Sequence, residues 1–556
     1  MSTSHQLADG SAASGEDGKL HRKLGFWSLT AAGIGSVIGS AWLFAPQAAA
    51  QFAGPSAIIS WVIAGVMMLA VALVSAELGM VHPESGGIVR YPQYSNGRLT
   101  GGVIGWCLWV AYIAVPATEA AGVMQYLGSL VPGLYADARL TGPGIGCAVV
   151  LMAVFVLLNW FGVKLFAISN NVVTAIKIFI PTIAVVALLA TGFSRHGGGG
   201  AANFTAHGFA PNGPTACLSL IAVAGIVFAY SGFSNIVNLS GEAKNPRRTI
   251  PLSLTVTMAF TILLYIGLQV AFIVAAPESK VLGRLGWAGI DFESPFASLA
   301  MTAGMFWLFC ILMADAAISP SGAGLVFTTA NARNVFGLAK NGFIPRWFAK
   351  VHEKSGIPRR ALVLNFVLGL AFLLPLPSWQ KIVAVTGVLG SFTICIASIS
   401  VIVFRLRGLA AEKDRLPGIA WIAPVAFVIS TLVLFWVQWA QLIVVAPIIA
   451  IGVVIYLISH FAKKRAAAEL LGGVWFIAWM AFIYAASFVG SYGGKGRLPE
   501  PWGSIIVAVV SVGFYAWGIA SGVRYMAGSH EVERRIRAGQ AAREATAAGN
   551  AELAGA

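Results

Sequence analysis

Residues 33–41 read Gly-Ile-Gly-Ser-Val-Ile-Gly-Ser-Ala and lie inside an apolar segment that runs from about Phe26 to Ala50. The segment is long enough to cross a bilayer, which takes about 20 helical residues. Its glycines weaken the helix, since each Gly costs about 1 kcal/mol relative to Ala. Unpaired backbone groups cannot face lipid, so this stretch must line a cavity or pack closely on a neighbouring helix. We expect the first of these, an unwound helix whose free backbone groups bind a small solute.

The composition indicates a membrane protein with many spans. Of the 556 residues, 58% are hydrophobic and only 10% are charged, and a soluble core does not need so much uninterrupted apolar sequence. Apolar stretches of about 20 residues divide the chain into about fourteen spans. We therefore expect an all-α integral membrane protein in a lipid bilayer.

The net charge of +15 would by itself allow a nucleic-acid-binding protein, but the distribution of the charge argues against one. Most of the 36 Lys and Arg residues fall in the two tails and in the connections on the same side of the predicted membrane. Basic residues concentrate on the cytoplasmic side of membrane proteins. The charge therefore predicts that both termini are cytoplasmic, and it predicts no nucleic-acid partner.

The chain divides into four predicted parts. Residues 1–23 have no apolar core next to a cleavage site, so we expect a disordered cytoplasmic tail and not a signal peptide. Residues 24–462 hold a core of twelve helices, and residues 463–527 hold two additional transmembrane helices. Residues 528–556 form a charged cytoplasmic tail.

Two ionisable residues of the third and fifth spans are predicted to lie deep in the membrane. An ionisable group there costs at least about 2.5 kcal/mol unless it faces water or a partner. Glu119 fits either substrate or proton handling or a structural hydrogen bond. Lys177 lies roughly 20 Å along a helix from Lys164 at the cytoplasmic edge, too far to reach the headgroups there. Lys177 is then either a proton carrier or the permanent partner of Glu119 or Asp315.

The eighth span adds a third buried ionisable residue. Asp315 is followed by Ser319, Pro320 and Ser321. A carboxylate and two hydroxyls beside a helix-breaking proline are unusual in apolar surroundings, so they indicate a functional role.

The sixth span is interrupted in the same way as the first. It ends in Ser231-Gly232-Phe233-Ser234-Asn235, and Gly232 and Gly35 lie at matching depth on antiparallel segments. Each interruption opens a block of five spans, which is typical of an inverted repeat with a binding site near the membrane midplane. Half-helix ends there suit a carboxylate on one side and an ammonium on the other, so a zwitterion would satisfy both.

Three motifs resemble those of the amino acid–polyamine–organocation (APC) permeases. They are Gly-Ser-Val-Ile-Gly-Ser-Ala at 35–41, Ser-Gly-Phe with Gly-Glu-Ala-Lys-Asn-Pro-Arg-Arg and Ile-Pro at 231–251, and Ala-Lys-Asn-Gly-Phe-Ile-Pro at 339–345. The resemblance covers about residues 23–460. It implies the five-plus-five inverted repeat of the leucine transporter, with broken first and sixth helices.

The resemblance also implies which residues act. Gly39, Ser40 and Ala41 would present donors to the substrate carboxylate, and the carbonyls of Val37 and Ser231 would accept from its amino group. Phe228 corresponds to the aromatic ring that closes over the substrate. Ser234 lies at a position of the sixth span where many members have a carboxylate. The residues implied in proton coupling are Lys177, Asp315, Glu119, Ser319 and Ser321. The Lys177 amine would face the first span and Ser319 or Ser321.

These features predict a secondary transporter that imports an amino acid coupled to protons by alternating access. Asp315 and Glu119 suggest similarity to the bacterial aspartate–proton symporters, hence a bacterial inner membrane. An amino acid/amine exchanger on the same fold is the alternative, and a channel or a receptor is another. An enzyme finds no support, because no catalytic or metal-ligand spacing is present. We expect no metal and no cofactor besides protons, while the substrate, the oligomeric state and the role of the last two helices stay open.

Overall fold

The computed structural model describes residues 24–541, except for 85, 162, 195–199, 278–281, 284, 353–356, 463–465, 530–532, 535 and 539–540. The predicted N-terminal tail, residues 1–23, and most of the predicted C-terminal tail, 528–556, lie outside the described residues.

Helices make up most of the described chain, as predicted. The first five spans are α2 (Phe26–Val37) with α3 (Ala41–Ala53), α4 (Ala57–Val81), α5 (Gly87–Gly128), α6 (Gly142–Phe161) and α7 (Val163–Ser194). The next five are α8 (Gly213–Val223) with α9 (Ile226–Tyr230), η3 (Ser231–Phe233) and α10 (Ser234–Asn238), then α11 (Pro246–Ala275), α13 (Phe306–Lys340), α14 (Arg359–Leu373), and α15 (Trp379–Ile394) with α16 (Ile396–Leu406). The last four are α17 (Ile419–Trp436), α18 (Trp439–Ala462), α20 (Val474–Val489) and α21 (Trp502–Gly528).

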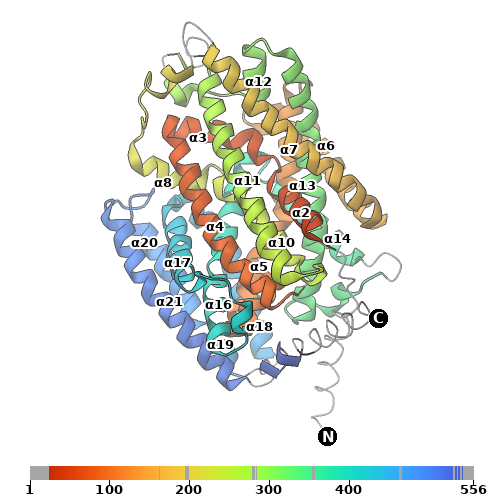
Figure 1. Ribbon diagram of the computed structural model, residues 1–556, viewed down its shortest axis with the longest axis vertical. Helices are drawn as coiled ribbons and strands as arrows, with labels where there is room; N and C mark the ends of the chain where they lie inside the picture. Colours follow the sequence, from red (N-terminus) through yellow and green to blue (C-terminus); the bar gives the residue numbers. More distant parts are fainter. Residues whose placement is uncertain are drawn as a thin grey trace.

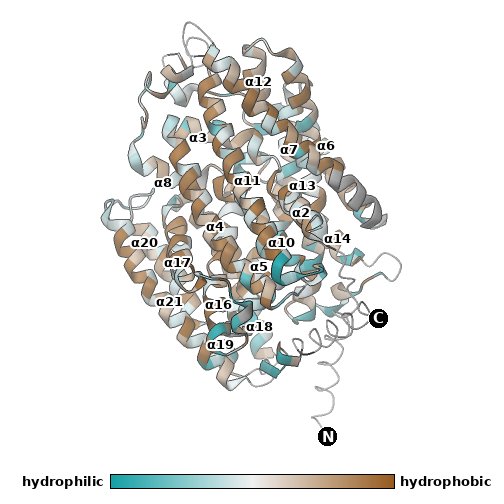
Figure 2. Ribbon diagram, viewed as in Figure 1, coloured by the Kyte–Doolittle hydropathy of each residue, from teal (hydrophilic) through white to brown (hydrophobic). Residues whose placement is uncertain are grey.

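Short elements connect these helices. They are α12 (Pro295–Thr302), α19 (Ala468–Leu471), the two-stranded hairpin of β1 (Tyr135–Ala136) and β2 (Arg139–Leu140), and 3-10 turns. The long helices run beside one another, and α20 and α21 lie at one edge (Figure 1). Hydrophobic residues cover their lengths, while hydrophilic residues gather near α10 and α19 (Figure 2). The structure therefore confirms an all-α membrane fold.

Fewer helices are long enough to cross a membrane than the sequence predicts. Within the described residues, eleven helices are long and apolar enough to cross a membrane, or twelve if one bent pair counts as a span. The predicted number of about fourteen includes α14, which has 15 residues, and the first span, whose halves are each too short to qualify. Helix length alone therefore does not establish fourteen.

The third span lies at the centre of the bundle. The most apolar window of α5 is 89% buried, compared with 28% for α6, α18 and α21, whose apolar faces point outward. Helix α5 packs against α13 and α15, which places side chains of the third, eighth and tenth spans together.

The first span is broken where its glycine and serine content predicts. Helix α2 ends at Val37, and α3 begins at Ala41. Between them Ile38 is extended, with φ −86° and ψ 94°. The backbone groups of this gap lose their helical partners and must find others.

The sixth span is also broken, but its sharpest bend lies about two turns before the predicted position. The helix axis bends by 44° between α8 and α9. Gly225 takes a left-handed conformation there, with φ +80°, which glycine adopts without strain. The predicted break at Ser231–Phe233 is a 3-10 turn, η3, between α9 and α10.

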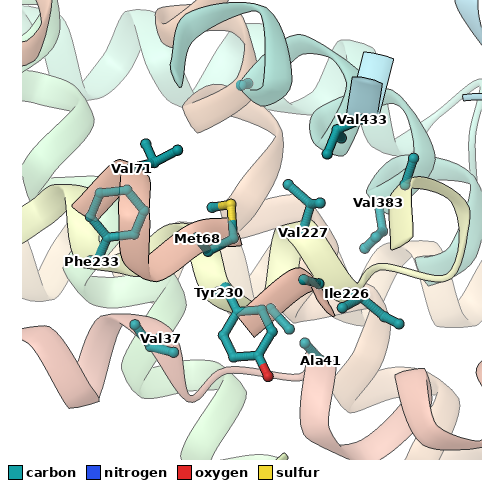
Figure 3. Close-up of a cluster of buried hydrophobic side chains, with 14 of the residues drawn as sticks. Val37, Ala41, Met68, Val71, Ile226, Val227, Tyr230, Phe233, Val383 and Val433 are labelled. Carbon is teal, nitrogen blue, oxygen red and sulfur yellow. The ribbon is translucent and has the colours of Figure 1, made fainter. Parts of the chain in front are cut away.

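Gly232 serves close packing and not the bend. A Cβ atom on Gly232 would lie 2.5 Å from the carbonyl carbon of Ser36 and 2.6 Å from the Val37 nitrogen. Figure 3 shows Val37 and Ala41 at the two ends of the unwound stretch, beside Tyr230 of the sixth span. The two interrupted spans therefore touch through their backbones.

We expect Gly232→Ala to destabilise the protein by about 1–3 kcal/mol, because the new methyl group overlaps the backbone of the first span. The midpoint of thermal unfolding in detergent measures this. Gly337→Ala in α13 is the matched control, since no atom lies within 4 Å of its added Cβ. Equal midpoints for the two variants would contradict the backbone contact.

Candidate substrate and proton site

A carboxylate of the third span caps the second half of the broken first span. The Ser40 backbone N–H donates to Glu119 Oε2 over 2.8 Å, and the Glu119 side chain is 2% exposed. A Cβ on Gly39 would lie 2.5 Å from Glu119 Oε1, so only glycine leaves room for the carboxylate. The N-terminus of α3 carries a partial positive charge that favours an anion. Glu119 therefore lies where the sequence predicts the substrate carboxylate.

Trp379, at the start of the tenth span, contacts both breaks. Its indole N–H donates to Ser40 Oγ over 2.6 Å, and its ring lies 5.0 Å from that of Phe44. A Cβ on Gly225 would lie 3.2 Å from the same indole ring. Sequence reasoning missed Trp379, because the face of a uniformly apolar span cannot be set to within one residue.

The carbonyl acceptors predicted for the substrate amino group are also bonded within the protein. The Tyr265 hydroxyl of α11 donates to the Val37 carbonyl over 2.9 Å. Ser234 Oγ donates to the Ser231 carbonyl over 3.0 Å. The described conformation therefore satisfies these groups with its own side chains, and Tyr265 is a second residue that the sequence did not reveal.

Lys177 reaches the first span. Its amine donates to the Gly35 carbonyl over 2.7 Å, and the side chain is 1% exposed. A Cβ on Gly322 of the eighth span would lie 3.3 Å from the amine. Glu119 of the third span binds the same break at Ser40, and Asp315 lies on the same helix as Gly322. Lys177 therefore lies between the first, third and eighth spans.

Asp315 and the two serines of α13 are arranged differently from the implied pattern. Ser319 Oγ donates to Asp315 Oδ1 over 2.7 Å. The second oxygen, Asp315 Oδ2, is buried without a hydrogen-bond partner among the described residues. Ser321 is half-buried, and the described residues show no bond from Lys177 to Ser319 or Ser321.

A cavity of about 60 Å³, measured as the space open to the centre of a water-sized sphere, lies beside the sixth span. Phe228, Ser231 and Ser234 line it, together with residues of α4, α5, α13, α15 and α16. Tyr112 of α5 also lines it and forms a hydrogen bond with Ser234 Oγ. The predicted residues of the first span, 37–41, do not line it. The predicted site residues therefore form two separate groups. One lines a cavity on the sixth span, and the other is a charged cluster at the first span.

The comparisons with known proteins cover nearly the whole chain. Residues 24–459 match the amino acid permease family. The chain belongs to this family, within the APC superfamily. It is 37% identical to the glutamate/serine transporter AimA of Bacillus subtilis over 94% of this chain and 98% of that protein. It is 33% identical to the aspartate-proton symporter of B. subtilis, over 91% and 98%, and 27% identical to the branched-chain amino acid permease BcaP, over 82% and 96%.

The broken first span explains how Lys177 and Glu119 can be buried inside a membrane protein. A broken span supplies backbone donors and acceptors that compensate buried charges without water. Glu119 and Lys177 bind opposite sides of the same break, at Ser40 and Gly35. A change in the charge of either one therefore acts on the first span directly.

We expect Glu119→Ala to lower the stability of this permease by about 1–3 kcal/mol, because it leaves the buried Ser40 N–H without an acceptor. Glu119→Gln removes the same charge but keeps an acceptor oxygen, so we expect a smaller loss. Thermal unfolding of both purified variants separates the hydrogen bond from the charge. Equal losses would show that the capping bond contributes nothing.

Proposed function

We propose that this permease imports an amino acid together with a proton by alternating access. The observation that carries the proposal is the hydrogen bond from buried Lys177 to the Gly35 carbonyl, at the break of the first span. Loss of the proton from this amine would remove a charge-assisted hydrogen bond, which is stronger than a neutral one. The first span would then be held less tightly against the fifth.

The balance of buried charge supports proton coupling. The cluster contains one amine, Lys177, and two carboxylates, Glu119 and Asp315, all at most 2% exposed. An uncompensated charge in a membrane interior is costly. One ammonium and two carboxylates carry a net negative charge, so the cluster is neutral only when it binds one further proton. One bound proton is therefore favoured by charge neutrality.

Substrate and proton would meet at Glu119. The substrate carboxylate needs the N-terminus of α3, where the Ser40 N–H now donates to Glu119. A substrate that takes this position displaces the Glu119 carboxylate, which is then buried without its donor. Taking up a proton relieves that cost. Binding of the substrate would in this way favour binding of the proton.

The named activities of the relatives agree with this proposal. One relative is named as an aspartate-proton symporter and another as a glutamate/serine transporter. The alternative is an exchanger that swaps an amino acid for an amine. It would show counterflow that does not depend on a proton gradient.

We expect Lys177→Ala to lower uptake driven by an inward proton gradient at least about tenfold in proteoliposomes, equal to about 1.4 kcal/mol. Exchange of labelled for unlabelled substrate at equal pH should survive, since it needs no net movement of protons. Lys381→Ala is the control, because it removes an exposed lysine near the start of the tenth span. Full gradient-driven uptake by Lys177→Ala would refute the proposed role. Wild-type counterflow with no response to pH would select the exchanger.

A further inference from the structure

The cavity beside the sixth span has a lining without charge. Its polar lining consists of Ser, Thr and Tyr hydroxyls, and the other residues that line it are apolar or glycine. Lys177, Glu119 and Asp315 are not among the lining residues. A charged substrate side chain in this cavity would therefore be buried without a partner of opposite charge.

Such burial is unfavourable for either sign of charge. Taking a carboxylate or an ammonium out of water costs several kcal/mol unless a partner compensates it. A small hydroxyl or aliphatic side chain avoids this cost. A cavity with this lining would therefore favour an uncharged side chain over a charged one.

The hydroxyls in the cavity leave acceptor positions free. Ser234 Oγ donates to the Ser231 carbonyl over 3.0 Å, so in its contact with Tyr112 it accepts and the tyrosine donates. Ser231 Oγ donates to the Phe228 carbonyl over 2.8 Å. Each hydroxyl oxygen has two lone pairs, so Tyr112 and Ser231 both keep acceptor capacity toward the cavity. A substrate hydroxyl could donate to either.

We propose that this cavity receives the side chain of the substrate, that this side chain is small and uncharged, and that the Tyr112–Ser234 pair favours one with a hydroxyl. This rests on the proposed amino acid transport. Serine and threonine fit this description, alanine fits it without the hydroxyl, and glutamate, aspartate, lysine and arginine do not.

The experiment is uptake of labelled serine into proteoliposomes in the presence of unlabelled competitors. We expect threonine and alanine to compete at least about tenfold more strongly than glutamate, aspartate, lysine or arginine. We also expect Tyr112→Phe to reduce the preference for serine over alanine about tenfold. Tyr126→Phe, a buried tyrosine of the same helix outside the cavity, should leave that preference unchanged.

Each result decides between the proposals. Competition by glutamate or aspartate that equals threonine would overturn the inference about charge while leaving amino acid transport intact. An unchanged preference in Tyr112→Phe would overturn the role of the hydroxyl. If no amino acid is taken up or exchanged, the proposed function itself falls, and this inference falls with it.

A second inference concerns the last two spans, which lie beyond the residues that match the family. Helix α5 is kinked at Asn96 and Gly97, where Gly97 has φ +84° and ψ 177°. The Asn96 side chain is fully buried and donates to the Gly518 carbonyl of α21 over 2.8 Å. A Cβ on Gly522 of α21 would lie 3.0 Å from the Asn96 amide nitrogen and 3.0 Å from the Ser95 carbonyl oxygen. The kink therefore fits directly against α21.

The segment of α5 that precedes this kink forms part of the cavity wall. Ile88, Tyr91 and Pro92 of α5 line the cavity. Ser95 Oγ is 2.8 Å from Ser400 Oγ of the tenth span, and Ser400 lines the cavity too. A shift of the kink would move these residues together.

We infer that α21 positions the cavity wall by holding the kink of α5, with Asn96 as the positioning residue. The last two spans then take part in substrate binding without touching the substrate. Their effect would appear in the affinity for substrate, not only in stability.

Gly522→Val places a side chain against the kink, and Gly513→Val on the same helix is the matched control, because nothing lies within 4 Å of its Cβ. We expect the KM for uptake to rise about fivefold or more in Gly522→Val, with the maximal rate per molecule within about twofold of wild type. Gly513→Val should match the wild type in both.

If Gly522→Val does not accumulate in the membrane, Asn96→Ala carries the same expectation, since it removes the hydrogen bond and adds no atom. A lowered thermal midpoint with an unchanged KM would show a purely structural contact and overturn the inference. A raised KM in Gly513→Val as well would overturn it too, because that change does not reach the kink.

Discussion

A helix that is opened inside a membrane must have its freed backbone groups satisfied by the rest of the protein, since lipid offers no hydrogen bonds. In the first span the Ser40 N–H is met by Glu119 of α5, and the Gly35 carbonyl by Lys177 of α7. The Val37 carbonyl is met by a tyrosine hydroxyl of α11. Three other spans therefore bind one short gap. The rest of the arrangement, including the buried charges, depends on this requirement.

The same requirement makes a change of state inexpensive. A substrate carboxylate that replaces Glu119 at Ser40 exchanges one charge-assisted hydrogen bond for another, so the net free energy of the exchange is small. A ligand shifts a conformational equilibrium only by its difference in affinity for the two states. In the proposed function the difference would come from the displaced side chain, because a carboxylate without a donor and an amine without an acceptor are both costly inside a membrane. The substrate would thus compete with Glu119 for the Ser40 N–H.

The broken first span and the buried lysine could be predicted from the sequence, because the position of a residue along an apolar segment sets its depth in the membrane. The broken first span follows from Gly39 and Ser40 within an apolar segment, and the depth of Lys177 follows from the helical rise. The position of the bend in the sixth span could not be predicted. Gly225 and Gly232 are the same residue type, yet one supplies a positive φ and the other supplies room for a backbone. Trp379 was missed for a related reason, since contacts across a bundle depend on helix rotation, which a uniformly apolar sequence does not specify.

The boundary of the family match at residue 459 is not a boundary in the packing. Helix α21 places Gly518 and Gly522 against α5 and α16, and glycines at such contacts let backbones approach closely in a membrane. The contact is made at the kink of the most buried helix, where Asn96 has given up helical geometry and needs a partner for its amide. A kink in α5 and an additional helix pair are therefore linked physically. Without α21 the buried Asn96 amide would lose this partner, so the additional spans are part of the packed core.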